Sequence, residues 1–118
     1  MKKRISPIWL AKECARLAEN KKGRRVAVYD VRRLTPFYDY CVVCSGNSNV
    51  QVNGISEAII QELKKLGILP LHREGLGLAQ WILLDYSCVM VHVFKEDTRK
   101  YYGLEELWGK AKAVNLKE

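Results

Sequence analysis

The stretch WILLDYSCVMVHVF, residues 81–94, constrains the fold of this chain more than any other segment. Apolar residues alternate on both sides of Ser87-Cys88, which predicts two strands joined by a two-residue turn. Such a turn pairs Trp81 with Phe94 at the open end of the hairpin. The remaining pairs are 82 with 93, 83 with 92, 84 with 91 and 85 with 90. Ser-Cys is a poor turn dipeptide, because both residues would need positive φ, and a slip of one residue would exchange the two faces.

The predicted hairpin has two chemically different faces. One face carries the core residues Ile82, Leu84, Tyr86, Val89, Val91 and Val93. The other carries Trp81, Leu83, Asp85, Met90, His92 and Phe94. Because diagonal neighbours across a sheet are within reach, His92 is expected close to Trp81 and Asp85. This mixture is typical of the centre of a protein interface, unless a helix such as the segment 104–108 covers it as ordinary core.

Catalytic interpretations of this second face lack essential parts. Asp85 and His92 could act as orienter and base, but Cys88 would lie about 13 Å farther along the strand, too far to serve as the nucleophile. A metal-dependent nucleotidyltransferase needs two carboxylates that converge on Mg²⁺, and the chain has no D-x-D pair. Cys41 and Cys44 have the CxxC form, yet strand alternation sends them to opposite faces. We therefore expect neither catalytic residues nor a metal or cofactor.

The rest of the chain predicts alternating helices and strands. Ser6-Pro7 has the form of a helix N-cap followed by proline, and Ser48 to Gln51 has the capping-box pattern. Helices are expected at 7–20 and 48–66, and a third begins at 96, followed by a last amphipathic segment at 103–108. Strands are expected at 26–31, 39–45, 68–75, 81–86 and 89–94. This order predicts an α/β fold with one domain over residues 1–118, built on a mixed five-stranded sheet with flanking helices.

Basic residues are concentrated towards the N-terminus. Residues 1–33 hold 11 Lys/Arg against 3 acidic residues, a net charge of +8, whereas the other 85 residues sum to −1. Such a segment favours a polyanion such as RNA, with an attraction that weakens as salt rises, although a solvated helix face and a basic loop explain it equally well. No stretch approaches the roughly 20 apolar residues of a membrane span, and the first residues lack the apolar core of a signal peptide. A cytoplasmic protein without a membrane partner is expected.

Several motifs together resemble one known family. They are DVRRLT from Asp30, DYCVVCSGNS from Asp39, Glu74-Gly75, WILLDY from Trp81, VHVF from Val91 and YYGLEELW from Tyr101. In this order, over about residues 8–110, the chain is similar to the iojap-like ribosomal silencing factors. It departs from their pattern at Ser87-Cys88, where Gly-Asp is usual, and at Val50, where Arg is frequent.

The resemblance implies a fold, a function and a set of site residues. The implied fold is a nucleotidyltransferase-like topology without the catalytic acids. The implied function is that of a translational repressor, not an enzyme, that binds the large ribosomal subunit through ribosomal protein fourteen and obstructs joining of the small subunit. The positions that match the family's partner-binding surface are Trp81, Asp85, His92, Asp39, Ser45, Glu74 and Tyr101.

Two other functions stay open on the sequence. An RNA-binding module of ribosome assembly would bind free RNA through the basic N-terminal third, with a steep salt dependence. In the repressor, the same basic third would favour nearby ribosomal RNA. A metal-dependent nucleotidyltransferase-like enzyme would bind a nucleotide together with Mg²⁺. The aromatic hairpin face is also compatible with a homodimer that must open before it docks on a ribosome.

Overall fold

The computed structural model describes residues 5–103, 106 and 111–116. Its elements are α1 (Pro7–Asn20), β1 (Arg24–Asp30), β2 (Tyr40–Gly46), α2 (Asn49–Lys65), β3 (His72–Glu74), β4 (Trp81–Asp85), β5 (Val89–Lys95), α3 (Glu96–Tyr102) and β6 (Lys112–Ala113). The α/β fold and the predicted order of elements are confirmed as far as α3. The amphipathic segment expected at 103–108 falls largely outside the described residues.

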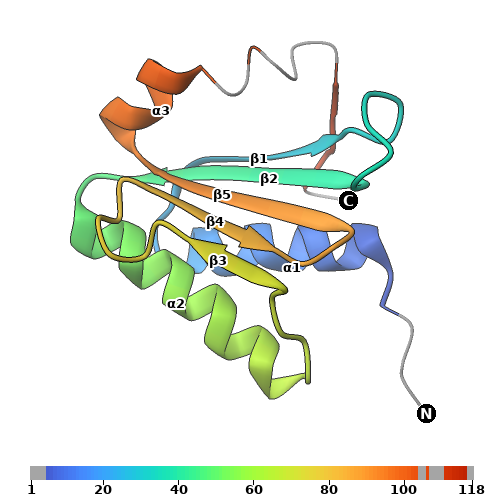
Figure 1. The fold of residues 1–118 in the computed structure, drawn as a ribbon, viewed down its shortest axis with the longest axis horizontal. Coiled ribbons are helices and arrows are strands. Elements are labelled where there is room, and N and C mark those ends of the chain that lie inside the picture. Colours follow the sequence, from blue (N-terminus) through green and yellow to red (C-terminus); the bar gives the residue numbers. More distant parts are fainter. Residues whose placement is uncertain (1–4, 104–105, 107–110, 117–118) are drawn as a thin grey trace.

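The sheet has six strands in the order β3-β4-β5-β2-β1-β6 (Figure 1). β2 and β5 pair in parallel, and the other neighbouring strands pair antiparallel. The prediction of five strands is wrong by one, because Lys112 and Ala113 form β6 beside Asp30 and Tyr29 of β1. A strand of two residues has no periodicity of its own, so only its pairing with a distant edge defines it.

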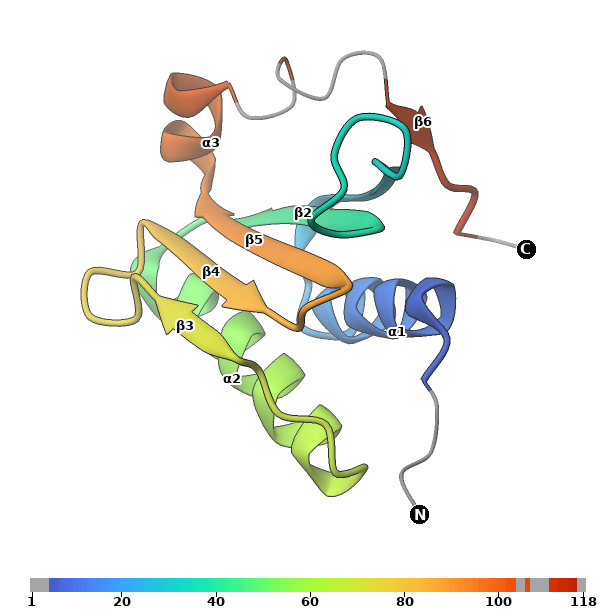
Figure 2. The ribbon, with the colours of Figure 1, turned by 45° about the vertical axis from the view of Figure 1, so that its right-hand side comes forward.

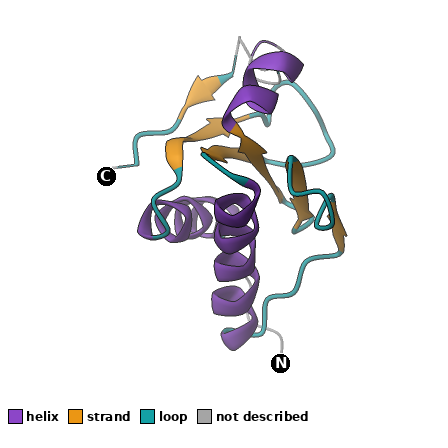
Figure 3. Ribbon diagram, turned by 90° about the vertical axis from the view of Figure 1, so that its left-hand side faces the viewer, coloured by secondary structure: helices purple, strands orange, loops and turns teal. Residues whose placement is uncertain are grey.

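Helices cover the two faces of the sheet unequally. α1 and α2 pack on one face, and α3 lies on the other face at one end of the sheet (Figures 1 and 3). The larger core fills the space under α1 and α2, with Leu10 and Cys14 from the first helix and Ile55 and Ile59 from the second. β2 is buried along its whole length between these layers, which explains its continuous apolar run YCVVC.

Both long helices begin where their capping residues predict. The Ser6 hydroxyl accepts from the Trp9 N–H at 3.3 Å, and the Ser48 hydroxyl accepts from the Gln51 N–H at 3.2 Å. The return half of the capping box is displaced by one residue, since Gln51 Oε1 accepts from the Asn47 N–H at 2.6 Å. The Gln51 amide is thereby oriented to donate to the Lys22 carbonyl at 3.0 Å. One side chain thus ties the start of α2 to the turn that follows α1.

The β4–β5 hairpin has the predicted register, with Trp81 opposite Phe94 and Asp85 opposite Met90. The predicted division of faces is also confirmed, because the expected core residues of the hairpin lie under α1 and α2. Phe94 instead joins a smaller cluster on the opposite face. Cys41 belongs to that smaller cluster and Cys44 to the larger core, so the CxxC side chains point apart as predicted.

The turn of this hairpin differs from the expected type. Only Ser87 has positive φ, at 74°, whereas the sequence predicted it for Cys88 as well. The Cys88 N–H donates to the Tyr86 carbonyl at 3.0 Å, which closes a γ-turn around Ser87. Asp85 Oδ1 accepts from the Ser87 N–H at 2.8 Å, and the Tyr86 N–H donates to the Val89 carbonyl at 2.9 Å. These bonds fix the hairpin register without the glycine that such turns normally use.

The glycine of the Glu74-Gly75 motif holds β3 close to the start of β4. Gly75 has a φ of 84°, and a Cβ there would lie 2.0 Å from the Trp81 carbonyl oxygen. We expect Gly75→Ala to lower the free energy of unfolding by about 3 kcal/mol or more, through backbone strain and steric overlap. The matched control is Gly77→Ala, because nothing lies within 4 Å of a Cβ at that position. Urea unfolding of both variants measures the difference, and equal stabilities would contradict the assigned contact.

Candidate binding surface

Strand pairing arranges the face that carries α3 in three rows across the sheet. Because paired residues project to the same side, each row forms a line of neighbouring side chains. The first row is Trp81, Phe94, Ser45 and Arg24; the second is Glu74, Leu83, His92 and Val43; the third is His72, Asp85, Met90 and Cys41. Five of the seven predicted site residues therefore share this face, and each row contains at least one of them.

Aromatic side chains gather around Trp81 at the α3 end of the face. Its ring stacks on Phe94, with centroids 4.9 Å apart, and meets Tyr102 of α3 at 4.8 Å. Tyr101 contacts the edge of Tyr102 at 5.3 Å and is 85% exposed. Phe94 is fully buried, whereas Trp81 is half-buried. The cluster is thus anchored in the sheet below and open to a partner above.

His92 is a buried partner of Trp81. The Trp81 indole N–H donates to His92 Nδ1 at 3.1 Å, so this nitrogen is an unprotonated acceptor. His92 is only 6% exposed, and burial lowers the pKa of its imidazole to about 4. A neutral His92 therefore orients the indole ring at neutral pH. The expected nearness to Trp81 is confirmed.

Asp85 and Asp39 lie at the opposite end of the face, beside the hairpin turn. The Asp85 carboxylate is half-buried and accepts from the Ser87 N–H. The Asp39 N–H donates to the Cys88 carbonyl at 2.8 Å, which places Asp39 next to the same turn. Glu74 is exposed on β3, at the edge of the sheet. These three acids border the face and do not converge on one point.

Ser45 is buried within a network that attaches α3 to the sheet. Its hydroxyl donates to Glu96 Oε1 at 2.6 Å and accepts from Arg99 Nη1 at 3.1 Å. Arg99 is 4% exposed and also donates to the carbonyls of Arg24, at 3.3 Å, and Arg25, at 2.9 Å. The Ser45 hydroxyl and the Arg25 guanidinium hold the pKa of Glu96 below its usual range. Ser45 therefore lies beneath α3, where it positions the helix.

Sequence reasoning missed Tyr102 and Arg99. Tyr102 adjoins the predicted Tyr101, and the pair of tyrosines in a short helix was the available signal. Arg99 gave no signal, because its acceptors are backbone carbonyls 74 and 75 residues away in the chain. α3 stands at one end of this face (Figure 2), whereas the segment 104–108, expected as a cover, falls largely outside the described residues.

The described side chains do not form a catalytic arrangement on this face. The Asp85 carboxylate bonds to the turn, and His92 bonds to Trp81. Burial raises the pKa of the Cys44 thiol to about 12 and also raises that of Cys88, which disfavours the thiolate a nucleophile requires. Among the described residues, no three His, Cys, Asp or Glu side chains gather as a metal site would need.

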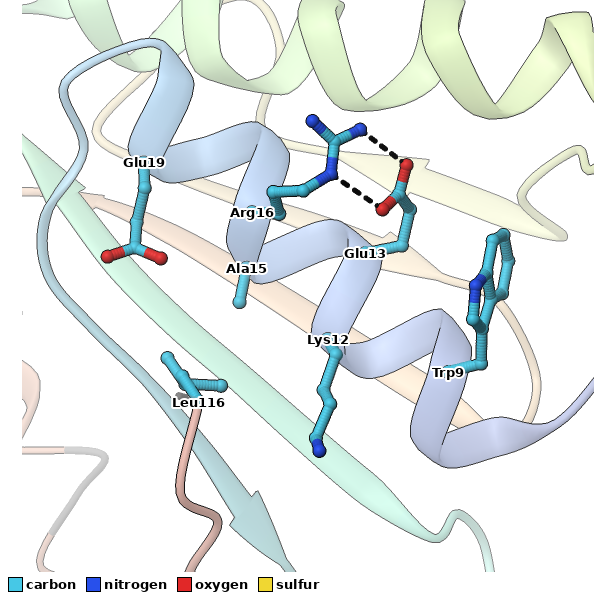
Figure 4. Close-up of a pocket in the computed structure, with 7 residues that line it drawn as sticks. All are labelled: Trp9, Lys12, Glu13, Ala15, Arg16, Glu19 and Leu116. Carbon is cyan, nitrogen blue, oxygen red and sulfur yellow. Dashed lines mark hydrogen bonds and ion pairs between the residues drawn. The ribbon is translucent and has the colours of Figure 1, made fainter. Parts of the chain in front are cut away.

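A small hollow of about 220 Å³ lies on the outer side of α1, in the opposite layer (Figure 4). Trp9 stands at one end, and Leu116 of the C-terminal segment flanks it. Glu13 and Arg16 point towards each other and form an ion pair of 2.6 Å, so these two charged groups at the hollow are already paired. Trp9 is 44% exposed and lies far from the Trp81 cluster, so it serves as the control position for substitutions of Trp81.

The fold defines a single-domain α/β protein that exposes an aromatic face on its sheet. The family model described as "Ribosomal silencing factor during starvation" matches residues 4–118, and the chain belongs to this ribosomal silencing factor family. The chain is 36% identical to the ribosomal silencing factor of Bacillus subtilis over 107 residues, which cover 91% of each protein. It is 37% identical to that of Halalkalibacterium halodurans over 98 residues, covering 83% of this chain and 84% of the relative.

Solved structures agree with this assignment. A crystal structure of a protein from Chromobacterium violaceum superposes with a TM-score of 0.86 at 30% identity, covering 89% of this chain and 88% of that one. The resemblance drawn from the sequence motifs is thus confirmed at the level of family and fold. The Bacillus and Halalkalibacterium relatives are named as silencing factors, not as enzymes. None of the helices in the described part of the chain is long and apolar enough to cross a membrane.

The buried imidazole predicts a specific loss of stability in mild acid. The unfolded chain protonates His92 near its ordinary pKa of 6.5, whereas the folded protein resists protonation down to about 4. The contribution of the neutral His92 to the free energy of unfolding is therefore fully present above pH 6.5 and is lost as the pH falls from 6.5 towards 4. The loss amounts to about 2 kcal/mol at pH 5. Urea unfolding at pH 7.5 and pH 5 measures this loss. The His92→Gln variant should lack this component, and an identical pH dependence in both proteins would refute the assignment.

The network beneath α3 predicts a structural role for the Ser45 hydroxyl. Ser45→Ala removes the donor to the half-buried Glu96 and one acceptor of the buried Arg99. We expect the free energy of unfolding to fall by about 1–3 kcal/mol. Chemical denaturation provides the measurement, and an unchanged midpoint would show that the network does not support α3.

Proposed function

We propose that this protein is a non-enzymatic translational repressor that binds the large ribosomal subunit and sterically blocks joining of the small subunit. Its contact is the Trp81 surface, defined as the half-buried or exposed residues Glu74, Trp81, Leu83, Asp85, Met90, Tyr101 and Tyr102. The observation that carries the proposal is the half-buried Trp81, held between Phe94 and Tyr102 on a face without a catalytic arrangement.

The composition of the Trp81 surface fits a protein partner. Tryptophan and tyrosine supply most of the binding energy in protein interfaces, especially where their surroundings exclude water. Trp81 already loses most of its freedom in the free protein, because Phe94, His92 and Tyr102 fix its ring. A side chain that is held in place before binding loses less entropy on association. Apolar Leu83 and Met90 extend the patch, and the acids at its border supply polar contacts.

Family membership supports a ribosomal partner in this proposal. The relatives are named ribosomal silencing factors, and the family resemblance points to ribosomal protein fourteen at the subunit interface as the docking site. A body of 41 × 33 × 27 Å bound there would occupy space that the small subunit needs. Repression then requires no chemistry, only occupancy of the site. In keeping with this mode of action, we propose that the protein works in the cytoplasm.

Trp81 is the residue whose loss should weaken docking most. We expect Trp81→Ala to reduce affinity for isolated large subunits by roughly 30-fold, or about 2 kcal/mol, because it removes the central aromatic anchor. The matched control is Trp9→Ala, which removes a half-exposed tryptophan from the opposite layer and should bind like the unchanged protein. Co-sedimentation over a concentration series measures both variants, with circular dichroism to establish that each is folded. Equal binding by Trp81→Ala would refute the assigned surface.

The same variants test the repressor function itself. Excess protein should prevent separated subunits from forming complete ribosomes on a sucrose gradient, whereas Trp81→Ala should permit joining at the same concentration. Complete ribosome formation in the presence of excess unchanged protein would overturn the proposed function. A parallel sedimentation series of the free protein shows whether a homodimer uses the same face and competes with docking.

A further inference from the structure

Residues 21–25, KKGRR, comprise the tight turn after α1 and the first two residues of β1, and we call this segment the basic turn. The side chains of Lys21, Lys22, Arg24 and Arg25 are all exposed. Arg25 pairs with Glu96 at 3.2 Å. In the described part of the chain, no acidic group lies within ion-pair distance of Lys21, Lys22 or Arg24. Three neighbouring cations thus have no acidic partner among the described residues.

The backbone of the basic turn is strained at one of these cations. The Gly23 N–H donates to the Ala18 carbonyl at 2.8 Å and the Lys22 N–H to the Glu19 carbonyl at 2.9 Å, which is the Schellman arrangement. Lys22 occupies the left-handed position of this motif, with a φ of 63°, where glycine is the residue without strain. The adjacent glycine cannot exchange places with it, because a Cβ at position 23 would lie 2.8 Å from the Ala18 oxygen.

Backbone carbonyls hold the basic turn in this shape. Gln51 donates to the Lys22 carbonyl at 3.0 Å, and the buried Arg99 donates to the carbonyls of Arg24 and Arg25. Arg25 itself has a φ of 48°, a second left-handed residue within five positions. These hydrogen bonds use the main chain, so they fix the loop without engaging the side chains of Lys21, Lys22 and Arg24.

The basic turn lies at the same end of the sheet as Trp81, the aromatic end of the Trp81 surface. Arg24 pairs with Ser45, Ser45 with Phe94, and Phe94 with Trp81, so one row joins them across four strands. Three strand spacings separate the backbones of Arg24 and Trp81 by about 14 Å. α3 stands between them on this row, and Arg99 bonds both to Ser45 and to the basic turn. The two patches therefore form one rigid, two-part face.

We propose that the basic turn binds the phosphate backbone of ribosomal RNA next to the protein on which the Trp81 surface docks. This inference rests on the proposed function and assigns a second contact to the same complex. Exposed cations that follow one another on a fixed loop suit the repeated phosphates of a nucleic-acid backbone, because each phosphate contact releases counterions. An acidic protein segment is the competing partner, and it offers carboxylates without that repeated spacing.

The salt dependence of binding separates this contact from the aromatic one. The double variant Lys21→Gln/Arg24→Gln should bind large subunits about tenfold more weakly at low salt, and its slope of log affinity against log salt should shrink by about 1.5. The charge-matched control is Lys64→Gln/Lys65→Gln, at the far end of α2, which should keep the original slope. Trp81→Ala should lose affinity with its slope unchanged. A double variant with the original slope and affinity would overturn the inference.

A single substitution separates the charge of Lys22 from its structural role. Lys22→Gly relieves the left-handed strain, so its melting temperature should equal or exceed that of the unchanged protein. Its affinity for large subunits should nevertheless fall about threefold at low salt, with a slope smaller by about 0.8. A more stable variant with undiminished binding would contradict a phosphate contact at Lys22.

Cross-linking identifies the class of the partner. A photoreactive benzoylphenylalanine at Asn20, an exposed residue beside the basic turn, leaves every cation in place. Irradiation on large subunits should give a product whose mobility changes after ribonuclease treatment. A product with a ribosomal protein instead would overturn the RNA assignment. Failure of the unchanged protein to sediment with large subunits would refute the proposed function itself. Normal sedimentation of the unchanged protein, with a double variant that keeps its affinity and salt slope, would refute only the RNA contact.

Discussion

The register of the β4–β5 hairpin is the constraint on which the rest of the structure depends. Ser87 adopts a φ of 74°, and hydrogen bonds made by the Asp85 carboxylate and the Cys88 N–H close the turn around it. Because strand side chains alternate, a shift of one residue would carry Trp81 into the space under α1 and α2. The aromatic cluster, the buried His92 and the row that leads to the basic turn all follow from this one local arrangement.

α3 converts the sheet face into a surface with two parts. Its Tyr102 rests on Trp81, while its buried Arg99 bonds Ser45 and the carbonyls of β1. The helix has only seven residues, too few to be stable in isolation, so these contacts must hold it. A surface supported in this way is suited to binding by shape and charge, which agrees with the occlusion mechanism proposed for the chain.

Much of the fold could be predicted from local patterns. The helix caps, the two faces of the hairpin and its pairing follow from side-chain chemistry and from the periods of 3.6 and 2 residues. β6 could not be predicted, because its two residues become a strand only beside β1. The face shared by Trp81, Asp85 and His92 was predictable, whereas the burial of Ser45 and the contacts of Arg99 and Tyr102 were not. Those depend on which segments the folded chain brings together.

The sequence by itself determined which residues alternate, which side of each strand is apolar, and that no pair of carboxylates is spaced for metal chemistry. Only the tertiary structure decided that Trp81 would lie half-open between Phe94 and Tyr102, and that Arg24 would share its row. The physical reason is the range of the interactions. Local periodicity acts over a few residues, whereas the bonds of Arg99 join positions 54 to 75 residues apart, and only packing of the whole domain brings such groups into contact.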